Sequence, residues 1–135
     1  DMSSTHSANP LSCSAGLAVI DEIKSKNLIF ESKRKGEILL TELKKIKIKF
    51  PKIIKYIFGK GLIAAILFKS TKKPDQVNLM ASKITEHCMQ RGLLVVHTGR
   101  ESIKIGPPLT ISDKALLEGI QVLKDSIKYF YENEY

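Results

Sequence analysis

The first ten residues gather hydroxyl side chains and backbone N–H groups directly in front of a predicted helix. Residues 3–7 hold three serines and one threonine, and Asn9-Pro10 is a typical helix start because Asn caps the N-terminus and Pro fits the first turn. Hydroxyls and N–H groups ahead of a helix are suited to an anion such as a phosphate. From the residues alone, however, a frayed and solvated terminus is the favoured interpretation.

A second candidate site residue is the lysine in the strand-like segment Ser102–Ile105. In this segment Ser102 and Lys104 alternate with Ile103 and Ile105. Successive side chains of a strand point to opposite faces, so isoleucines directed to the core place Lys104 on the other face of the sheet. The alternative is a solvated strand lysine, because long charged side chains commonly extend into water.

The cysteines and histidines match no metal or nucleophile pattern. Cys13 and Cys88 lie far apart and in no C-x-x-C spacing, and we expect both to be reduced core thiols in a cytoplasmic protein. His6, His87 and His97 lack metal-ligand spacing as well. Adjacent helical residues point apart, so His87 and Cys88 cannot act as a base and a nucleophile. We therefore predict that His87 and His97 are structural and that there is no metal site.

Length and charge limit the class of protein. The 135 residues fit one domain with its own core, and 22 Lys and Arg against 14 Asp and Glu give a net charge of +8. Much of the excess lies in Lys24–Lys60, which holds twelve basic residues and three glutamates. The apolar stretch Gly61–Phe68 is too short to cross a bilayer, and the first residues do not resemble a signal peptide. We expect no membrane partner, and the missing initiator Met is consistent with a piece of a longer protein.

Apolar periodicity predicts alternating groups of helices and strands. The helix after Asn9 is apolar almost all round, so it must be enclosed by more than one neighbour, and residues absent from this chain are one source of such neighbours. The predicted segments are helices at 10–25 and 28–50, strands at 53–58 and 62–68, a helix around 77–88, strands at 93–96 and 102–105, and a helix from about 112. This order indicates an α+β domain with a small, mostly antiparallel sheet, in which strand 62–68 is central and helices cover one face.

Four segments, taken together, carry a resemblance to a known family. They are T-H-S-A-N-P-L-S-C-S-A-G-L-A-V-I-D, G-K-G-L-I-A-A-I, R-G-L-L-V-V-H and I-K-I-G-P-P-L-T-I-S-D-K-A-L-L-E-G. In order and spacing they resemble the C-terminal part of class III pyridoxal-phosphate aminotransferases, the group of the ornithine, acetylornithine and 4-aminobutyrate enzymes. The resemblance extends over essentially the whole chain.

The resemblance implies a particular place in a larger fold. Residues 28–135 would be the small C-terminal α+β domain of a fold-type-I pyridoxal-phosphate transferase, and residues 1–27 the cofactor-phosphate loop and long interdomain helix that precede it. The Schiff-base lysine, the acid paired with the pyridine nitrogen and most of the cofactor pocket would lie upstream, in a large domain. This chain alone should therefore not catalyse.

The resemblance also implies roles for individual residues. In such enzymes the threonine of the T-H-S-A-N-P motif reaches across the dimer interface to the cofactor phosphate of the other subunit. Thr5 takes that role here, with the Ser4 backbone beside it and His6 nearby. Lys104 stands where the family usually has an Arg that binds the substrate carboxylate with two hydrogen bonds. A lysine keeps the positive charge but lacks the planar guanidinium that makes this paired contact. Phe58 also replaces a common Arg, and we interpret it as a core substitution.

Three functions follow as hypotheses. The leading one is a homodimeric, cytoplasmic aminotransferase that moves an amino group between an amino acid or amine and a keto acid or aldehyde. A basic nucleic-acid-binding α+β module is the alternative from another class, because lysines and aromatics interleave in residues 44–56. We prefer a lysine-rich outer helix face as the explanation of that charge, because no recognisable nucleic-acid motif accompanies it, and we expect no nucleic-acid partner. The third is a noncatalytic relative, since Lys104 and Phe58 depart from the family pattern.

Overall fold

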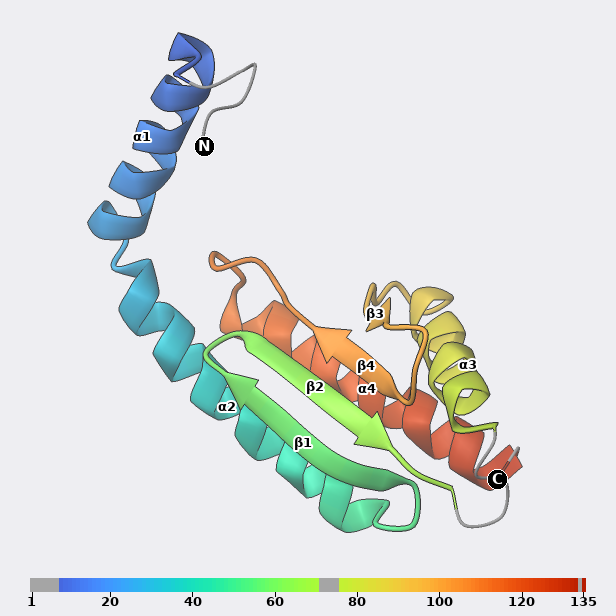
Figure 1. Cartoon of the computed structure of the whole chain (residues 1–135). Helices are drawn as coiled ribbons and strands as arrows, with labels where there is room; N and C mark the ends of the chain where they lie inside the picture. The colour runs from blue at the N-terminus through green and yellow to red at the C-terminus, as the bar shows by residue number, and fades with distance from the viewer. Residues whose placement is uncertain (1–7, 71–75, 134) are drawn as a thin grey trace.

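The structure, a computed structural model, describes residues 8–70, 76–133 and 135. These residues form helices and strands in the predicted order (Figure 1). The elements are α1 (Pro10–Ser25), α2 (Leu28–Lys49), β1 (Ile54–Lys60), β2 (Ile63–Phe68), α3 (Val77–Met89), β3 (Val96–His97), β4 (Ser102–Ile105) and α4 (Asp113–Asn133).

The strands form one antiparallel sheet in the order β1-β2-β4-β3, so β2 is central as predicted. Helices α2 and α3 contact the strands from one side, and α4 packs on both of these helices. No described element lies over the opposite side of the sheet (Figure 1). The prediction of an α+β domain with helices on one face is therefore confirmed.

The core lies between the sheet and the helices. Along β2, Ala64, Ile66 and Phe68 are at most 1% exposed, whereas Ile63 is 62% exposed. The strand therefore alternates between a covered face and an uncovered one, as the pleat requires. The helices complete the core with stripes at spacings of three and four: Leu39, Leu43 and Ile46 from α2, Met80, Ile84 and Cys88 from α3, and Leu116, Ile120, Leu123 and Ile127 from α4.

Capping groups lie at the helix starts and ends that the sequence predicts. The Asn9 side-chain oxygen accepts a hydrogen bond from the Leu11 N–H at 2.9 Å, and the Ser112 hydroxyl accepts one from the Ala115 N–H at 3.1 Å. After α3, Gly92 adopts a φ of 82°, which favours glycine at a helix end.

The strand ends differ from the prediction in two places. The predicted strand 93–96 is replaced by the two-residue β3, because Leu93 and Val95 pack against the core and do not pair with β4. An apolar run has the same composition in both situations, so the pattern could not separate them. The predicted linker residue Lys60 instead belongs to β1 and pairs with Ile63.

Helix α1 projects away from the rest of the chain (Figure 1). None of its residues is buried, and Leu11 and Leu17 are 80% and 63% exposed. Cys13 is exposed as well, so the prediction of a core thiol is wrong for Cys13, while it is confirmed for the buried Cys88. The reason is that among the described residues α1 has only α2 as a neighbour.

Arg34 joins the two long helices that cover the sheet. Its guanidinium on α2 donates to both carboxylate oxygens of Asp113 at the start of α4, at 2.8 and 2.7 Å, and to Glu31 at 2.9 Å. Hydrogen bonding to Arg34 lowers the pKa of the Asp113 and Glu31 carboxyls, and the same bonds raise the pKa of Arg34. Because these groups are partly exposed to water, screening keeps the stabilisation modest.

Candidate functional site

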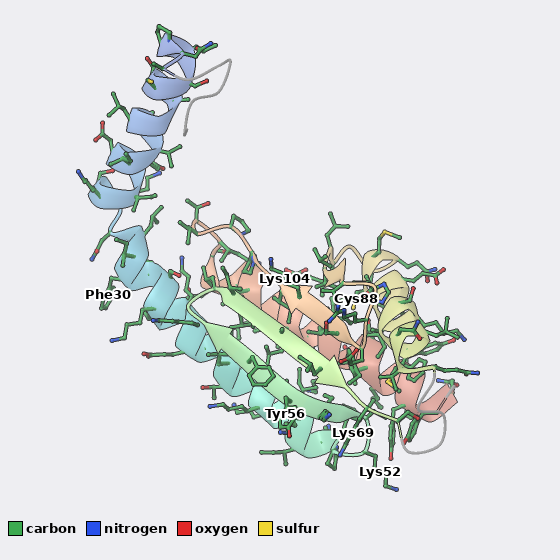
Figure 2. The ribbon with its side chains drawn as sticks, viewed as in Figure 1. Phe30, Lys52, Tyr56, Lys69, Cys88 and Lys104 are labelled. Carbon is green, nitrogen blue, oxygen red and sulfur yellow. The ribbon has the colours of Figure 1, made fainter. Side chains whose placement is uncertain are left out.

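The side of the sheet that no helix covers presents lysine, hydroxyl and aromatic side chains, and we refer to it as the open face. Strand pairing and the alternation of burial place its members opposite the core residues. The open face consists of Tyr56, Phe58 and Lys60 from β1, Ile63, Ala65 and Leu67 from β2, Ser102 and Lys104 from β4, and Val96 from β3. Figure 2 shows Lys104 on this side of the sheet.

Lys104 lies at the centre of the open face. It pairs with Ala65 on one side and with Val96 on the other, and it is exposed, whereas Ile103 beside it is fully buried. This confirms the prediction that Lys104 projects from the face opposite the core. Small Ala65 leaves room beside the lysine stem.

A pocket of about 520 Å³ opens on this face between the β1–β2 turn and the segment after β4. Its lining residues are Ser32, Lys60, Leu62, Ile63, Val96, Lys104, Gly106, Pro107 and Leu109, and we name it the open-face pocket. Two lysines and one hydroxyl supply its polar side chains, and no carboxylate of a described residue contributes to the lining. Such a pocket suits a ligand that combines an acid group with an apolar body.

Close packing against α2 positions the turn that follows Lys60. A Cβ atom built on Gly36 of α2 would lie 2.3 Å from the Gly61 carbonyl oxygen, so the helix and the turn meet backbone to backbone. Gly61 has a φ of 56°, a conformation that glycine adopts without strain. The Ser32 hydroxyl also accepts a hydrogen bond of 3.4 Å from the Leu62 N–H. One side of the pocket is therefore anchored to the helical layer.

Phe58 lies on the open face and not in the core. It is 55% exposed, so its interpretation as a core substitution is wrong. The apolar composition of the strand suggested burial, but Phe58 pairs with Ala65, whose side chain faces away from the helices. Its ring lies 5.6 Å from that of Tyr56, and two lysine ammonium groups, of Lys47 and Lys55, lie within 6 Å of the Tyr56 ring.

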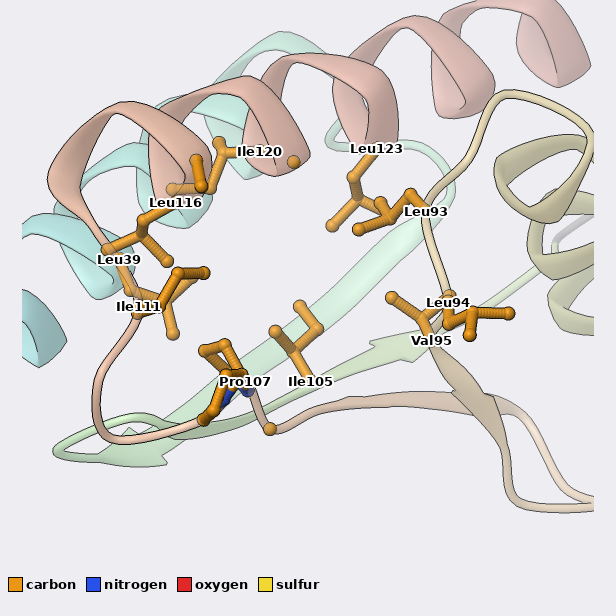
Figure 3. A pocket seen from close by; sticks show the side chains of 14 residues that line it. Leu39, Leu93, Leu94, Val95, Ile105, Pro107, Ile111, Leu116, Ile120 and Leu123 are labelled. Atoms are coloured by element: carbon orange, nitrogen blue, oxygen red, sulfur yellow. The ribbon is translucent and has the colours of Figure 1, made fainter.

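A second pocket, of about 250 Å³, lies beneath the sheet between α4 and the segments that flank β3 and β4 (Figure 3). Leu93, Val95 and Ile105 face Leu116 and Leu123 across it, and none of the described residues that line it carries a charge. This pocket lacks groups that could bind or transfer a proton, so of these two pockets the open-face pocket is the better candidate site.

His87 and Cys88 do not line the open-face pocket. Ser4, Thr5 and His6 lie outside the described residues. Burial raises the pKa of the Cys88 thiol despite an opposing hydrogen bond with Ser126, which disfavours a nucleophilic thiolate. The His87 ring stacks on Tyr129 with centroids 4.3 Å apart, as a structural residue would.

Residues 8–70, 76–133 and 135 contain neither a metal-binding cluster nor a membrane-spanning helix. Within them no three His, Cys, Asp or Glu side chains are arranged to hold a metal ion. Nor does any helix of these segments have the length and apolar character needed to cross a bilayer.

Lys60 is the site residue that the sequence did not reveal. The prediction assigned it to a Gly-rich linker, whereas it ends β1 and lines the same pocket as Lys104. Local patterns gave no signal for this, because the two lysines come together only through the pairing of β1, β2 and β4.

Comparisons with known proteins agree with this architecture. The family model described as aminotransferase class-III matches residues 1–127. The mitochondrial acetylornithine aminotransferase of Saccharomyces cerevisiae is 31% identical over 131 residues, which cover 97% of this chain and 29% of that protein. The mitochondrial ornithine aminotransferase of Arabidopsis thaliana is 34% identical over 125 residues, which cover 93% of this chain and 26% of that protein.

Solved structures give the same result. The crystal structure of acetylornithine aminotransferase from Elizabethkingia anophelis superposes with a TM-score of 0.84 at 28% identity, over 96% of this chain and 31% of that one. A transaminase solved with L-ala reaches a TM-score of 0.89 at 17% identity, which supports the fold alone. The chain thus spans less than a third of the length of these proteins.

Proposed function

Because this chain belongs to the class-III aminotransferase family, we propose that it is the C-terminal part of an enzyme that transfers an amino group between an amino acid or amine and a keto acid or aldehyde. The observation that carries the proposal is the family match over residues 1–127, together with an α+β fold that superposes on aminotransferase structures. Neither the family match nor the relatives favour a nucleic-acid-binding module.

Residues 1–27 act as the link to a large domain and residues 28–135 as the small C-terminal domain in this proposal. The exposed apolar side chains of α1, such as Leu11 and Leu17, support it, because a covering domain would remove them from water. The whole protein is a cytoplasmic homodimer in the proposal, although relatives named mitochondrial show that the family is not confined to one compartment.

Pyridoxal phosphate, when bound, supplies the electron sink for amino-group transfer. The hydroxyls and N–H groups of residues 3–7, ahead of the Asn9-capped start of α1, are a donor set that fits a phosphate. We assign the contact to Thr5 and the Ser4 backbone, directed at the cofactor of the other subunit. The chain spans only 29% of its acetylornithine aminotransferase relative, and in this proposal the Schiff-base lysine lies outside it, so that the chain by itself is inactive.

Lys104 binds the substrate carboxylate in this proposal. It projects into the open-face pocket as a single compact charge on a flexible stem. A forked Arg at this position would demand one carboxylate orientation, whereas a lysine accepts several. The protein should therefore use a wider range of amino donors at weaker affinity.

A panel of amino donors tests this function in the whole protein with cofactor saturated. Lys104→Ala should lower kcat/KM for carboxylate donors by about 10- to 100-fold, and much less for simple amines, because one charged hydrogen bond is lost. Lys104→Arg should sharpen the preference for donors with a well-placed carboxylate. Lys44→Ala, which removes an exposed lysine of α2, is the matched control.

Two results would contradict the proposal. Equal loss for charged and uncharged donors would remove Lys104 from the substrate site. Absence of turnover with every donor, in a folded protein that retains its cofactor, would favour the noncatalytic relative.

Cofactor retention tests the assignment of Thr5 separately. Thr5→Val should release pyridoxal phosphate faster during dialysis, because one charge-assisted hydrogen bond to the phosphate is lost. Absorbance of the bound cofactor gives the measurement, and Ser12→Ala on the exposed side of α1 is the control. Retention equal to that of the parent protein would show that Thr5 does not contact the phosphate.

A further inference from the structure

We propose that Lys60 is a second acid-binding residue of the open-face pocket, so that together with Lys104 it selects substrates with two acid groups. The inference rests on the proposed function, because it takes the open-face pocket as part of the substrate site. It concerns the end of the substrate that Lys104 does not hold.

Strand register brings the two lysines to one pocket. Lys60 pairs with Ile63, and Lys104 pairs with Ala65 of the same strand, so the two are separated by two strand spacings and two residues along the sheet. Standard strand dimensions then put their Cα atoms about 12 Å apart. Both side chains lie on the open face and line the pocket, and their flexible four-carbon stems can direct both ammonium groups at one short ligand.

The charges of the pocket favour a dianion over a monoanion. Within the part of the chain that the structure describes, neither Lys60 nor Lys104 has an ion-pair partner and no carboxylate lines the pocket. Leu62, Ile63 and Leu109 supply apolar surface in the same pocket. A ligand with one acid group neutralises one cation and leaves the other without a counter-charge.

Lys60 is also held in place, as a binding residue must be. The turn that follows it is fixed on α2 by the Gly36–Gly61 backbone contact and by the hydrogen bond between Leu62 and Ser32. The Ser32 oxygen accepts this hydrogen bond, and its hydroxyl hydrogen can be donated to an acid group, because Ser32 lines the same pocket. Lys60 and Ser32 therefore form one end of the pocket, and Lys104 forms the other.

Competitive binding to the whole protein tests the inference with three probes of equal chain length. Glutarate carries two carboxylates, its monoamide replaces one of them by a neutral group of the same shape, and pentanoate lacks the second polar group. We expect the parent protein to bind glutarate about 10-fold more tightly than either monoacid, because a second charged hydrogen bond forms in a partly open pocket. Calorimetry measures this preference without any turnover.

Four variants separate the possible outcomes. Lys60→Gln should abolish the preference for glutarate and leave pentanoate binding unchanged, while Lys60→Arg should retain the preference. Lys104→Gln should weaken all three probes, and Lys44→Gln on α2 should change none. If Lys60→Gln lowers the affinity for glutarate and pentanoate alike, or for neither, the inference is wrong while the role of Lys104 stands. If Lys104→Gln has no effect, the substrate site proposed above is wrong, and this inference fails with it.

Discussion

The covered and open faces of the sheet use the same kinds of residue for different purposes. In β2, Ile66 is fully buried and Ile63 is 62% exposed, although only two residues separate them. The cations differ in the same way: Arg34 in the covering layer holds two carboxylates, whereas Lys60 and Lys104 on the open face have none among the described residues. One face therefore stabilises the domain, and the other carries lysines without a carboxylate partner among the described residues, beside exposed apolar side chains.

Truncating the two isoleucines should show the largest contrast between the faces. Ile66→Ala removes packed methyl groups from the core and should lower the free energy of unfolding by about 2–5 kcal/mol. Ile63→Ala should change it by less than about 0.5 kcal/mol, because its side chain already contacts water. Urea unfolding of the 135-residue chain measures the two changes in the free energy of unfolding. The chain suits this experiment because its own helices and strands make the core. Similar losses for the two variants would mean that something covers the open face in this chain.

Glycine substitutions test whether the helical layer positions the open-face pocket. In Gly36→Ala the new Cβ would lie 2.3 Å from the Gly61 carbonyl oxygen, so the turn beside Lys60 must move, at a cost of about 1–3 kcal/mol. Gly119→Ala on α4 is the matched control: its Cβ would meet only the Leu93 side chain, at 3.2 Å and beside the apolar pocket. Helix propensity should then make Gly119→Ala more stable by about 0.5–1 kcal/mol. Thermal unfolding distinguishes the two, and equal behaviour would contradict the close contact at Gly36.

The ion pairs of the covering layer should give the smallest effect, and one that depends on pH. Arg34 lowers the pKa of Asp113, so this carboxylate stabilises the fold above its unfolded pKa near 4, and the contribution disappears as the pH falls through the lower folded value. Asp113→Asn should therefore lower the melting temperature slightly at pH 7, and the difference should vanish near pH 2. Glu118→Gln, at an exposed position of α4, serves as the control. A constant difference at all pH values would rule out this linkage.

Much of the fold could be predicted because its signals are local. The capping of α1 by Asn9, the apolar stripe of α4 and the alternation around Lys104 each lie within a few residues, and each is confirmed. Local signals also carry the family resemblance, since four short segments keep their order and spacing, and the family model matches the chain.

Periodicity states which residues share a face, but not what that face meets. The apolar character of Cys13 and Phe58 predicted burial for both, yet α1 has no covering neighbour among the described residues, and Phe58 lies on the side without helices. Whether a side chain is buried depends on the element that packs against it. The sequence of one helix or strand does not show which element that is.

The sequence by itself determined the types of the elements, the family and the side of the sheet on which Lys104 lies, because spacing along one segment decides each of them. The tertiary structure alone decided that Lys60 joins Lys104 in one pocket. Three strands had to pair in one register, and Gly36 had to admit the turn at Gly61, before two lysines 44 positions apart could line the same cavity. Such an arrangement depends on contacts between distant segments, and these contacts exist only once the chain has folded.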